Sequence, residues 1–173
     1  MSKTEENLKT AFAGESMARN KYTFFAKVAK KEGYHYIAKL FLETAENERR
    51  HAKDLFDLLN GIGDTIANMK EAIEGEDYEV NEMYPDFARQ AKEEGNKEAA
   101  ILFNTIAKVE EHHRDRYKKI LEMVLNETVY KRDEPIKWKC DVCGYISTGK
   151  EPPRECPCCK HAREHFEPAN MDV

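Results

Sequence analysis

The chain has 173 residues, of which 35% are charged and 40% hydrophobic, and its formal net charge is −5. This length allows one well-packed domain plus a small appended one. The acidic balance, without any basic stripe, argues against nucleic-acid binding. No apolar run approaches the roughly 18 residues of a membrane span, and no signal peptide opens the chain. We therefore expect a cytoplasmic protein that binds neither nucleic acid nor membrane.

Apolar residues recur at helical spacing over most of the chain, and Gly or Pro marks the breaks. We expect four long helices, at about residues 4–31, 34–60, 77–94 and 96–126. The connection 61–76 should contain a short helix around NMKEAI. Pro85 should kink or bulge the third long helix, because proline lacks a backbone donor and crowds the preceding turn.

The helical part contains an internal repeat with an offset of 62 residues. FAKVAKKEG (25–33) aligns with FARQAKEEG (87–95), and Glu48 and His51 align with Glu110 and His113. Two related helix pairs predict a four-helix bundle with approximate two-fold symmetry. We therefore predict a mostly α protein with a bundle at residues 1–130, a linker at 131–136 and a small domain at 137–173.

The predicted core stripes carry charged residues where apolar ones would be expected. Glu-x-x-His occurs twice at the repeat offset, and glutamates also face inward on the other two helices. Buried ion pairs would explain one such motif, but an unpaired buried carboxylate is costly and the pattern is repeated. The pattern matches the di-iron or di-manganese sites of ferritin-like bundles. The predicted ligands are Glu15, Glu48, His51, Glu79, Glu82, Glu110 and His113.

Charge and ligand type agree with iron or manganese at this site. Five carboxylates contribute −5, two ferrous ions contribute +4, and mixed oxygen and imidazole ligands suit these metals. Glu82 exceeds a symmetric set of four glutamates, which would allow ligand exchange during redox chemistry. Tyr22 and Tyr84 lie on the same faces, where their hydroxyls would either hydrogen-bond to the carboxylates or simply belong to the core.

All five cysteines lie within residues 140–159, which indicates metal binding rather than disulfides in a cytosolic chain. Cys140-x-x-Cys143 and Cys156-x-x-Cys159 form two knuckles that predict a tetrahedral site for zinc or one iron. Cys158 is a spare thiol in this interpretation. A structural zinc ribbon is the alternative, but CxxCGY, CPxC and the preceding Trp138 resemble the knuckles and aromatic core of rubredoxins.

A ferritin-like bundle followed by such a module resembles the rubrerythrin family over nearly the whole chain. The matching segments are AFAGESMARNKY, AENERRHA, YEVNEMYP and VEEHH. The resemblance implies three iron ions per chain, in one di-iron centre and one Fe(Cys)4 site. It implies a non-haem peroxidase of anaerobes that defends against oxidative stress. One iron would move between Glu82 and His51 as its oxidation state changes, which makes these two residues the expected catalytic pair.

The resemblance also implies partners. Hydrogen peroxide would be reduced to water, with electrons passing through the rubredoxin-like iron from a rubredoxin or an NAD(P)H-dependent reductase. Family members form homodimers, but the linker length does not decide whether electrons pass within or between chains. Three alternatives remain at this point: a ferroxidase that handles iron, an oxygen-activating hydroxylase or desaturase, and a helical scaffold carrying a zinc ribbon.

Overall fold

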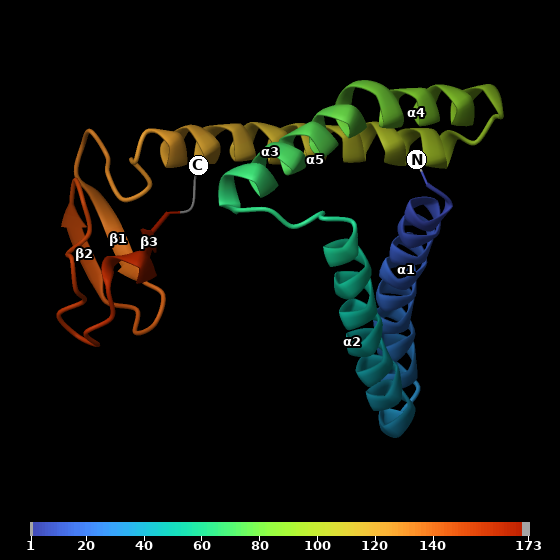
Figure 1. The fold of residues 1–173 in the computed structure, drawn as a ribbon, viewed down its shortest axis with the longest axis horizontal. Coiled ribbons are helices and arrows are strands. Elements are labelled where there is room, and N and C mark those ends of the chain that lie inside the picture. Colours follow the sequence, from blue (N-terminus) through green and yellow to red (C-terminus); the bar gives the residue numbers. More distant parts are fainter. Residues whose placement is uncertain (1, 171–173) are drawn as a thin grey trace. The chain divides into compact units, whose positions relative to one another are not determined.

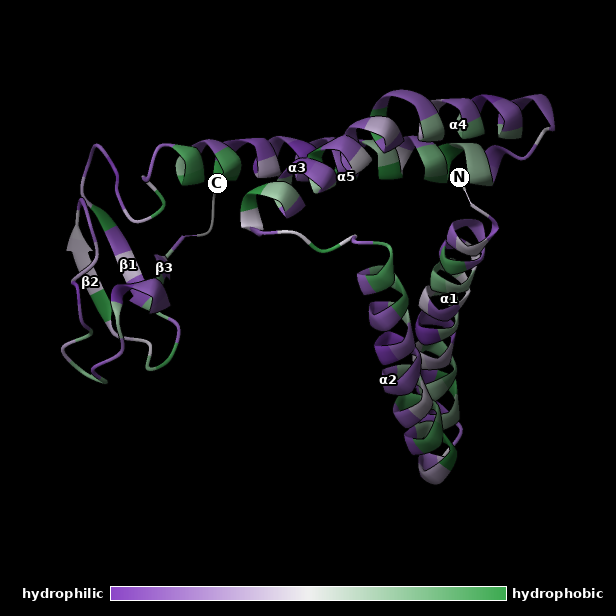
Figure 2. Ribbon diagram, viewed as in Figure 1, coloured by the Kyte–Doolittle hydropathy of each residue, from purple (hydrophilic) through white to green (hydrophobic). Residues whose placement is uncertain are grey.

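The structure is a computed structural model that describes residues 2–170 of the chain. The residues cluster into two compact units, Met1–Asp64 and Thr65–Val173. Figure 1 shows the elements of each unit, and Figure 2 shows hydrophobic and hydrophilic residues mixed along every helix, as amphipathic helices require. Within the described part of the chain, no helix is both long and apolar enough to cross a bilayer.

The first unit is an antiparallel helical hairpin of α1 (Lys3–Lys31) and α2 (His35–Leu58), as Figure 1 shows. Ser2 caps α1 by accepting a hydrogen bond from the Glu5 N–H. Gly33 ends the helix at a φ of 88°, a conformation that glycine adopts without a Cβ penalty. Ala26, Ala29 and Ala38 are buried against each other with Phe41 beside them, so small side chains bring the two helices together.

The second unit pairs α5 (Lys97–Leu125) with one interrupted helix made of three segments. These segments are α3 (Thr65–Tyr78), the π-helix η1 (Glu79–Met83) and α4 (Tyr84–Glu93). The helix predicted around NMKEAI is therefore present, but it is longer than expected, since it begins at Thr65 and runs through the rest of the predicted connection 61–76. Gly75 and the weak apolar periodicity of NMKEAIEGEDY concealed a continuous helix, which packing against α5 stabilises.

The π-helix is the bulged form of the distortion that Pro85 predicted from the sequence, a kink or a bulge. The Tyr84 N–H donates to the Glu79 carbonyl, an i→i−5 bond that places one extra residue in the turn. Pro85 follows at the start of α4, where its missing N–H costs little. The bulge therefore accommodates the proline without ending the helix.

A small antiparallel sheet closes the second unit, in the order β2-β1-β3. The strands are β1 (Ile136–Cys140), β2 (Ile146–Gly149) and β3 (Phe166–Pro168), with a short 3-10 turn, η2 (Arg163–His165), before β3. Trp138, Cys140, Cys156 and Phe166 form its buried core. The predicted fold class, mostly α with a small cysteine-bearing domain, is confirmed.

Candidate metal centres

The structure brings His, Cys, Asp and Glu side chains together in three groups among the residues it describes. They are Cys140, Cys143, Cys156 and Cys159; Glu15, Glu48 and His51; and Glu76, Glu110 and His113. In each group the ligand atoms lie within 4.8 Å of one another. The last two groups contain two carboxylates and one imidazole each, and one belongs to each unit. We call these two groups the half-sites.

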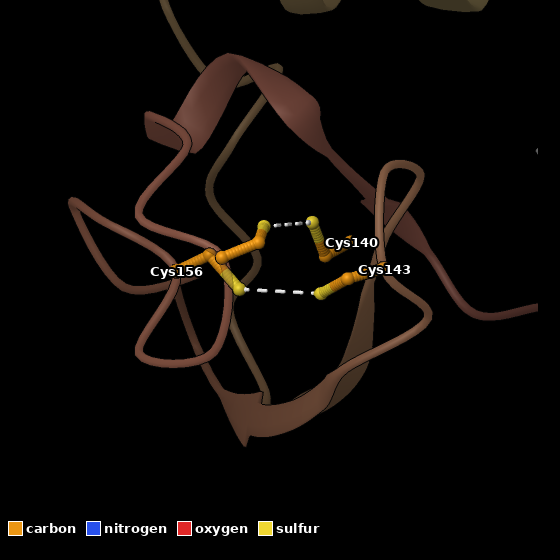
Figure 3. A group of neighbouring side chains, drawn as sticks. Cys140, Cys143 and Cys156 are labelled. Atoms are coloured by element: carbon orange, nitrogen blue, oxygen red, sulfur yellow. Dashed lines mark hydrogen bonds between the residues drawn. The ribbon is translucent and has the colours of Figure 1, made fainter.

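The four cysteines meet where the two knuckle loops face each other, as Figure 3 shows for the labelled residues. The Sγ atoms of Cys140 and Cys159 are 3.7 Å apart, and those of Cys143 and Cys156 are also 3.7 Å apart. Sulfur ligands about 2.3 Å from a tetrahedral metal lie about 3.8 Å from each other. The geometry therefore fits a metal ion and is too wide for disulfides. We call this part of the chain, residues 137–170, the four-cysteine module.

The knuckle backbone favours the thiolate form of Cys156. Burial opposes its ionisation, but the backbone N–H groups of Cys159 and Cys158 point at its sulfur and lower its pKa to about 7. A thiolate is the form that binds metal. Cys158 itself is exposed and stands outside the group of four, as the sequence predicted.

The first half-site lies on facing surfaces of α1 and α2. His51 Nδ1 lies 2.9 Å from Glu48 Oε2 and 3.4 Å from Glu15 Oε2. Ligands about 2.1 Å from one metal and at right angles lie about 3 Å apart, so these atoms fit a shared ion. The hydrogen bond between the two carboxyls raises the pKa of Glu15 and lowers that of Glu48, while the pKa of His51 is raised by its bond to Glu48.

The second half-site has the same chemistry on α3 and α5. His113 Nδ1 lies 2.7 Å from Glu110 Oε2 and 3.7 Å from Glu76 Oε1. Burial, and then the negative charge of Glu110, raises the pKa of both Glu76 and Glu79. Like charges held this close without a cation are unfavourable, so the group is suited to binding one.

Glu76 is a member of the second half-site that the sequence pattern did not predict. Of the predicted ligands, Glu79 and Glu82 belong to none of the three groups in the described residues, whereas Glu76 occupies the position that corresponds to Glu15. Gly14-Glu15 aligns with Gly75-Glu76 at an offset of 61, while Tyr22 aligns with Tyr84 at an offset of 62. The extra residue is the π-bulge at Glu79–Met83. A fixed offset of 62 aligns Glu15 with Asp77 and hides this match.

Arg114 of α5 forms an ion pair with Asp77 of α3 next to the second half-site. Its guanidinium is 3.3 Å from Asp77 Oδ1 and 2.9 Å from Asp115 Oδ1, and only 14% of its side chain is exposed. Asp77 directly follows Glu76, and Arg114 directly follows His113. The ion pair therefore holds the two backbones that carry these ligands at a fixed separation.

Tyr84 presents a protonated phenol near the second half-site. Burial raises its pKa, and the charges of Glu79, Glu110 and Glu76 raise it further. The hydroxyl therefore keeps its proton and remains a hydrogen-bond donor. For Tyr22 the structure shows ring contacts with Phe25 and Phe41, so its polar role stays a prediction.

The metal-free protein should lose stability as the pH rises. The raised pKa values of Glu76, Glu79 and His51 mean that the folded state holds protons which the unfolded chain releases earlier. This stabilisation is complete below the unfolded pKa values and is lost as pH rises through the folded ones. The lowered pKa of Glu48 makes stability rise with pH instead, but only in the acidic range in which an ordinary carboxyl group is protonated.

Thermal unfolding of chelator-treated protein between about pH 5 and pH 8 measures this effect. We expect the midpoint to fall with pH, and Glu76→Gln to flatten the slope. Iron-loaded protein should show the opposite tendency, because metal binding requires deprotonated ligands. A metal-free midpoint that rises steadily over this range would contradict the interpretation.

Fold and sites together define a ferritin-like metal protein with an appended four-cysteine module, and comparisons with known proteins agree. The rubrerythrin family model matches residues 6–121, and the model "Rubrerythrin, rubredoxin-like domain" matches residues 138–167. The chain belongs to the rubrerythrin family.

Several relatives match over nearly the full length of both chains. Rubrerythrin of Porphyromonas gingivalis is 49% identical, covering 96% of this chain and 90% of its own length. Putative rubrerythrin of Methanocaldococcus jannaschii is 46% identical, with 96% and 93% covered. A mixed-valence structure of nigerythrin is 34% identical, with 97% and 87% covered and a TM-score of 0.36, too low to support any structural argument.

The cofactors follow from the donor sets and the family. Carboxylate and imidazole ligands suit iron, and four thiolates at tetrahedral spacing suit a single iron. The protein therefore has a di-iron centre and one Fe(Cys)4 site, which together make three iron ions per chain.

Proposed function

We propose that this protein is a non-haem di-iron peroxidase that reduces hydrogen peroxide to water. The observation that supports this most directly is the pair of matching half-sites, each with two carboxylates and one imidazole, in a chain that also carries a four-thiolate site. The reaction H2O2 + 2 H+ + 2 e− → 2 H2O consumes two electrons. A ferrous pair held by the half-site residues would supply these electrons, and an iron held by the four cysteines would pass on the electrons that replace them.

The chain's own groups provide the surroundings that this chemistry needs. The glutamates of the half-sites neutralise the metal charge, and the two imidazoles add neutral ligands. The Tyr84 hydroxyl, which keeps its proton, can donate a hydrogen bond to an oxygen at the site. We propose that residues 1–130 form a ferritin-like di-iron bundle, followed by a linker at 131–136 and a rubredoxin-like domain at 137–173.

We propose Glu15, Glu48, His51, Glu76, Glu110 and His113 as the symmetric ligand set. Glu79 lies close enough to Glu110 for that charge to raise its pKa, which supports it as the additional carboxylate. The family resemblance implies that one iron exchanges its ligand between Glu82 and His51. In this proposal, Glu79 takes the role of Glu82 in that exchange. Glu82 as a ligand stays a prediction.

A comparison of Glu76→Ala with Glu82→Ala tests this set. Both variants remove one carboxylate from the same interrupted helix, and a melting temperature measured for each metal-free variant separates general effects on the fold from effects on the site. We expect Glu76→Ala to weaken iron binding by about 10- to 100-fold or more, as loss of an important group at a metal site does, and Glu82→Ala to weaken it much less. Iron content after equilibration with a competing chelator is the measurement. A larger loss of iron in Glu82→Ala than in Glu76→Ala would instead identify Glu82 as the ligand.

The physiological electron donor is proposed to be a rubredoxin or an NAD(P)H-dependent reductase, and the protein is proposed to act as a homodimer in the cytoplasm. An anaerobic titration tests the peroxidase function itself. Fully reduced protein should consume one peroxide for every two irons oxidised, without releasing oxygen. Uptake and mineralisation of added ferrous iron, with little consumption of peroxide, would favour the ferroxidase alternative.

A further inference from the structure

Arg132 lies in the junction between α5 and the four-cysteine module and forms hydrogen bonds on both sides of it. The Arg132 backbone N–H donates to the Lys150 carbonyl at 2.8 Å, which attaches the residue to the module next to β2. Its side chain reaches the exit of α5, where Nη1 donates to the carbonyls of Thr128 at 3.0 Å, Val129 at 3.3 Å and Lys131 at 2.7 Å. Bonds from a charged donor are stronger than those between neutral groups.

The same guanidinium also rests on the core of the module. Its central carbon lies 5.3 Å from the centre of the Trp138 ring, at a distance typical of a cation–π contact. Trp138 is fully buried beside Cys140 and Cys156, and its indole N–H donates to the Gly149 carbonyl at 3.0 Å. Arg132 therefore contacts the rigid part of the module that carries the metal ligands.

Further hydrogen bonds order the residues that directly follow α5. The Thr128 N–H donates to the Met123 carbonyl at 2.8 Å, which continues the last turn of α5. Tyr130 forms a longer bond of 3.4 Å to the Glu164 carbonyl of the module. Residues 127–132 therefore connect α5 to the module through a chain of bonds, and the guanidinium of Arg132 lies at its centre.

We propose that Arg132 is a positioning residue that holds the four-cysteine module at a fixed orientation on α5. The proposal rests on the proposed function, because orientation matters where the module delivers electrons. Electron transfer slows steeply as the separation of donor and acceptor grows. A module that moved about its linker would spend much of its time outside the productive range.

The test compares Arg132→Ala and Arg132→Lys with Arg154→Ala, which removes an exposed arginine from the same module. The visible absorption of the ferric Fe(Cys)4 site should be unchanged in all three, which shows that the module is folded. A glutamate-specific protease should cleave after Glu127 about tenfold faster or more in Arg132→Ala, because the bonds that order this segment are lost. Arg154→Ala should match the unmodified protein.

The functional measurement is rapid mixing of the fully reduced protein with peroxide. Oxidation of the di-iron centre should be unchanged, while oxidation of the Fe(Cys)4 iron should slow about tenfold or more in Arg132→Ala, as small misplacements of reacting groups do. Arg132→Lys should resemble Arg132→Ala, because lysine keeps the charge but lacks the planar fork.

Each other outcome overturns the proposal. Unchanged protease cleavage would show that Arg132 does not order the junction. Unchanged oxidation of the Fe(Cys)4 iron in Arg132→Ala would show that it does not position the module, and full activity of Arg132→Lys would show that the bonds of the guanidinium fork are not what positions it. Loss of the ferric colour would make Arg132 a folding residue instead. If peroxide fails to oxidise the unmodified protein, the proposed function falls, and the protease result still decides whether Arg132 fixes the module.

Discussion

Replacing Glu110 with alanine should reduce peroxide turnover by more than about 100-fold, since lost metal-site partners alone cost up to that factor. Glu110 lies at the centre of the second half-site. Its carboxylate is 2.7 Å from His113 Nδ1, and its charge raises the pKa values of Glu76, Glu79 and Tyr84. The variant should lose di-iron occupancy and keep the iron bound by the cysteines.

The stability of the Glu110→Ala variant separates a functional role from a structural one. Without metal, Glu110 is repelled by the carboxylates beside it, so its removal should leave the melting temperature of the metal-free protein unchanged or raised. Glu111→Ala, at the exposed neighbouring position, is the matched control and should retain activity and iron. Full turnover in Glu110→Ala with two fewer irons would show that the reaction does not use this centre.

Replacing Cys156 with serine should unfold the four-cysteine module and abolish its colour. Cys156 is fully buried with Trp138 and Cys140, so its sulfur is both a metal ligand and part of the core. In small metal domains, binding supplies folding free energy on the order of 10 kcal/mol. A module of three short strands around four buried residues has little other stabilisation.

The fluorescence of Trp138 reports this change, because it is the only tryptophan of the chain. In Cys156→Ser its emission should shift to that of a solvent-exposed indole, while helical circular dichroism is retained. Cys158→Ser, two residues away and outside the ligand group, should keep the ferric spectrum and a buried tryptophan. An intact spectrum in Cys156→Ser would contradict the ligand assignment.

The cysteine site was predictable because its spacing leaves little freedom. Two C-x-x-C knuckles determine which sulfurs converge, so Cys158 could be excluded from the sequence alone. The Glu-x-x-His motifs were equally informative, because residues three apart lie on one helical face. His51 with Glu48, and His113 with Glu110, accordingly meet in the structure at 2.9 Å and 2.7 Å.

Glu76 was not predictable by the same reasoning, because its partners lie on another helix. Its register depends on the π-bulge at Glu79–Met83, which shifts every residue before it by one position relative to the repeat. Pro85 predicted a kink or a bulge, but did not decide between them. The contacts of Arg132 were hidden for a similar reason, since Lys150 lies 18 residues further along the chain and meets it only when the sheet forms.

Rapid mixing of the fully reduced protein with hydrogen peroxide tests the central proposal most directly. The ferric Fe(Cys)4 colour should return quickly with peroxide, slowly with oxygenated buffer, and without the fast phase in Glu110→Ala. This result would show that peroxide is reduced at the carboxylate–histidine centre and that the cysteine-bound iron feeds it. If peroxide does not restore the ferric colour, or if the fast phase is retained in Glu110→Ala, peroxide reduction at the carboxylate–histidine centre is contradicted.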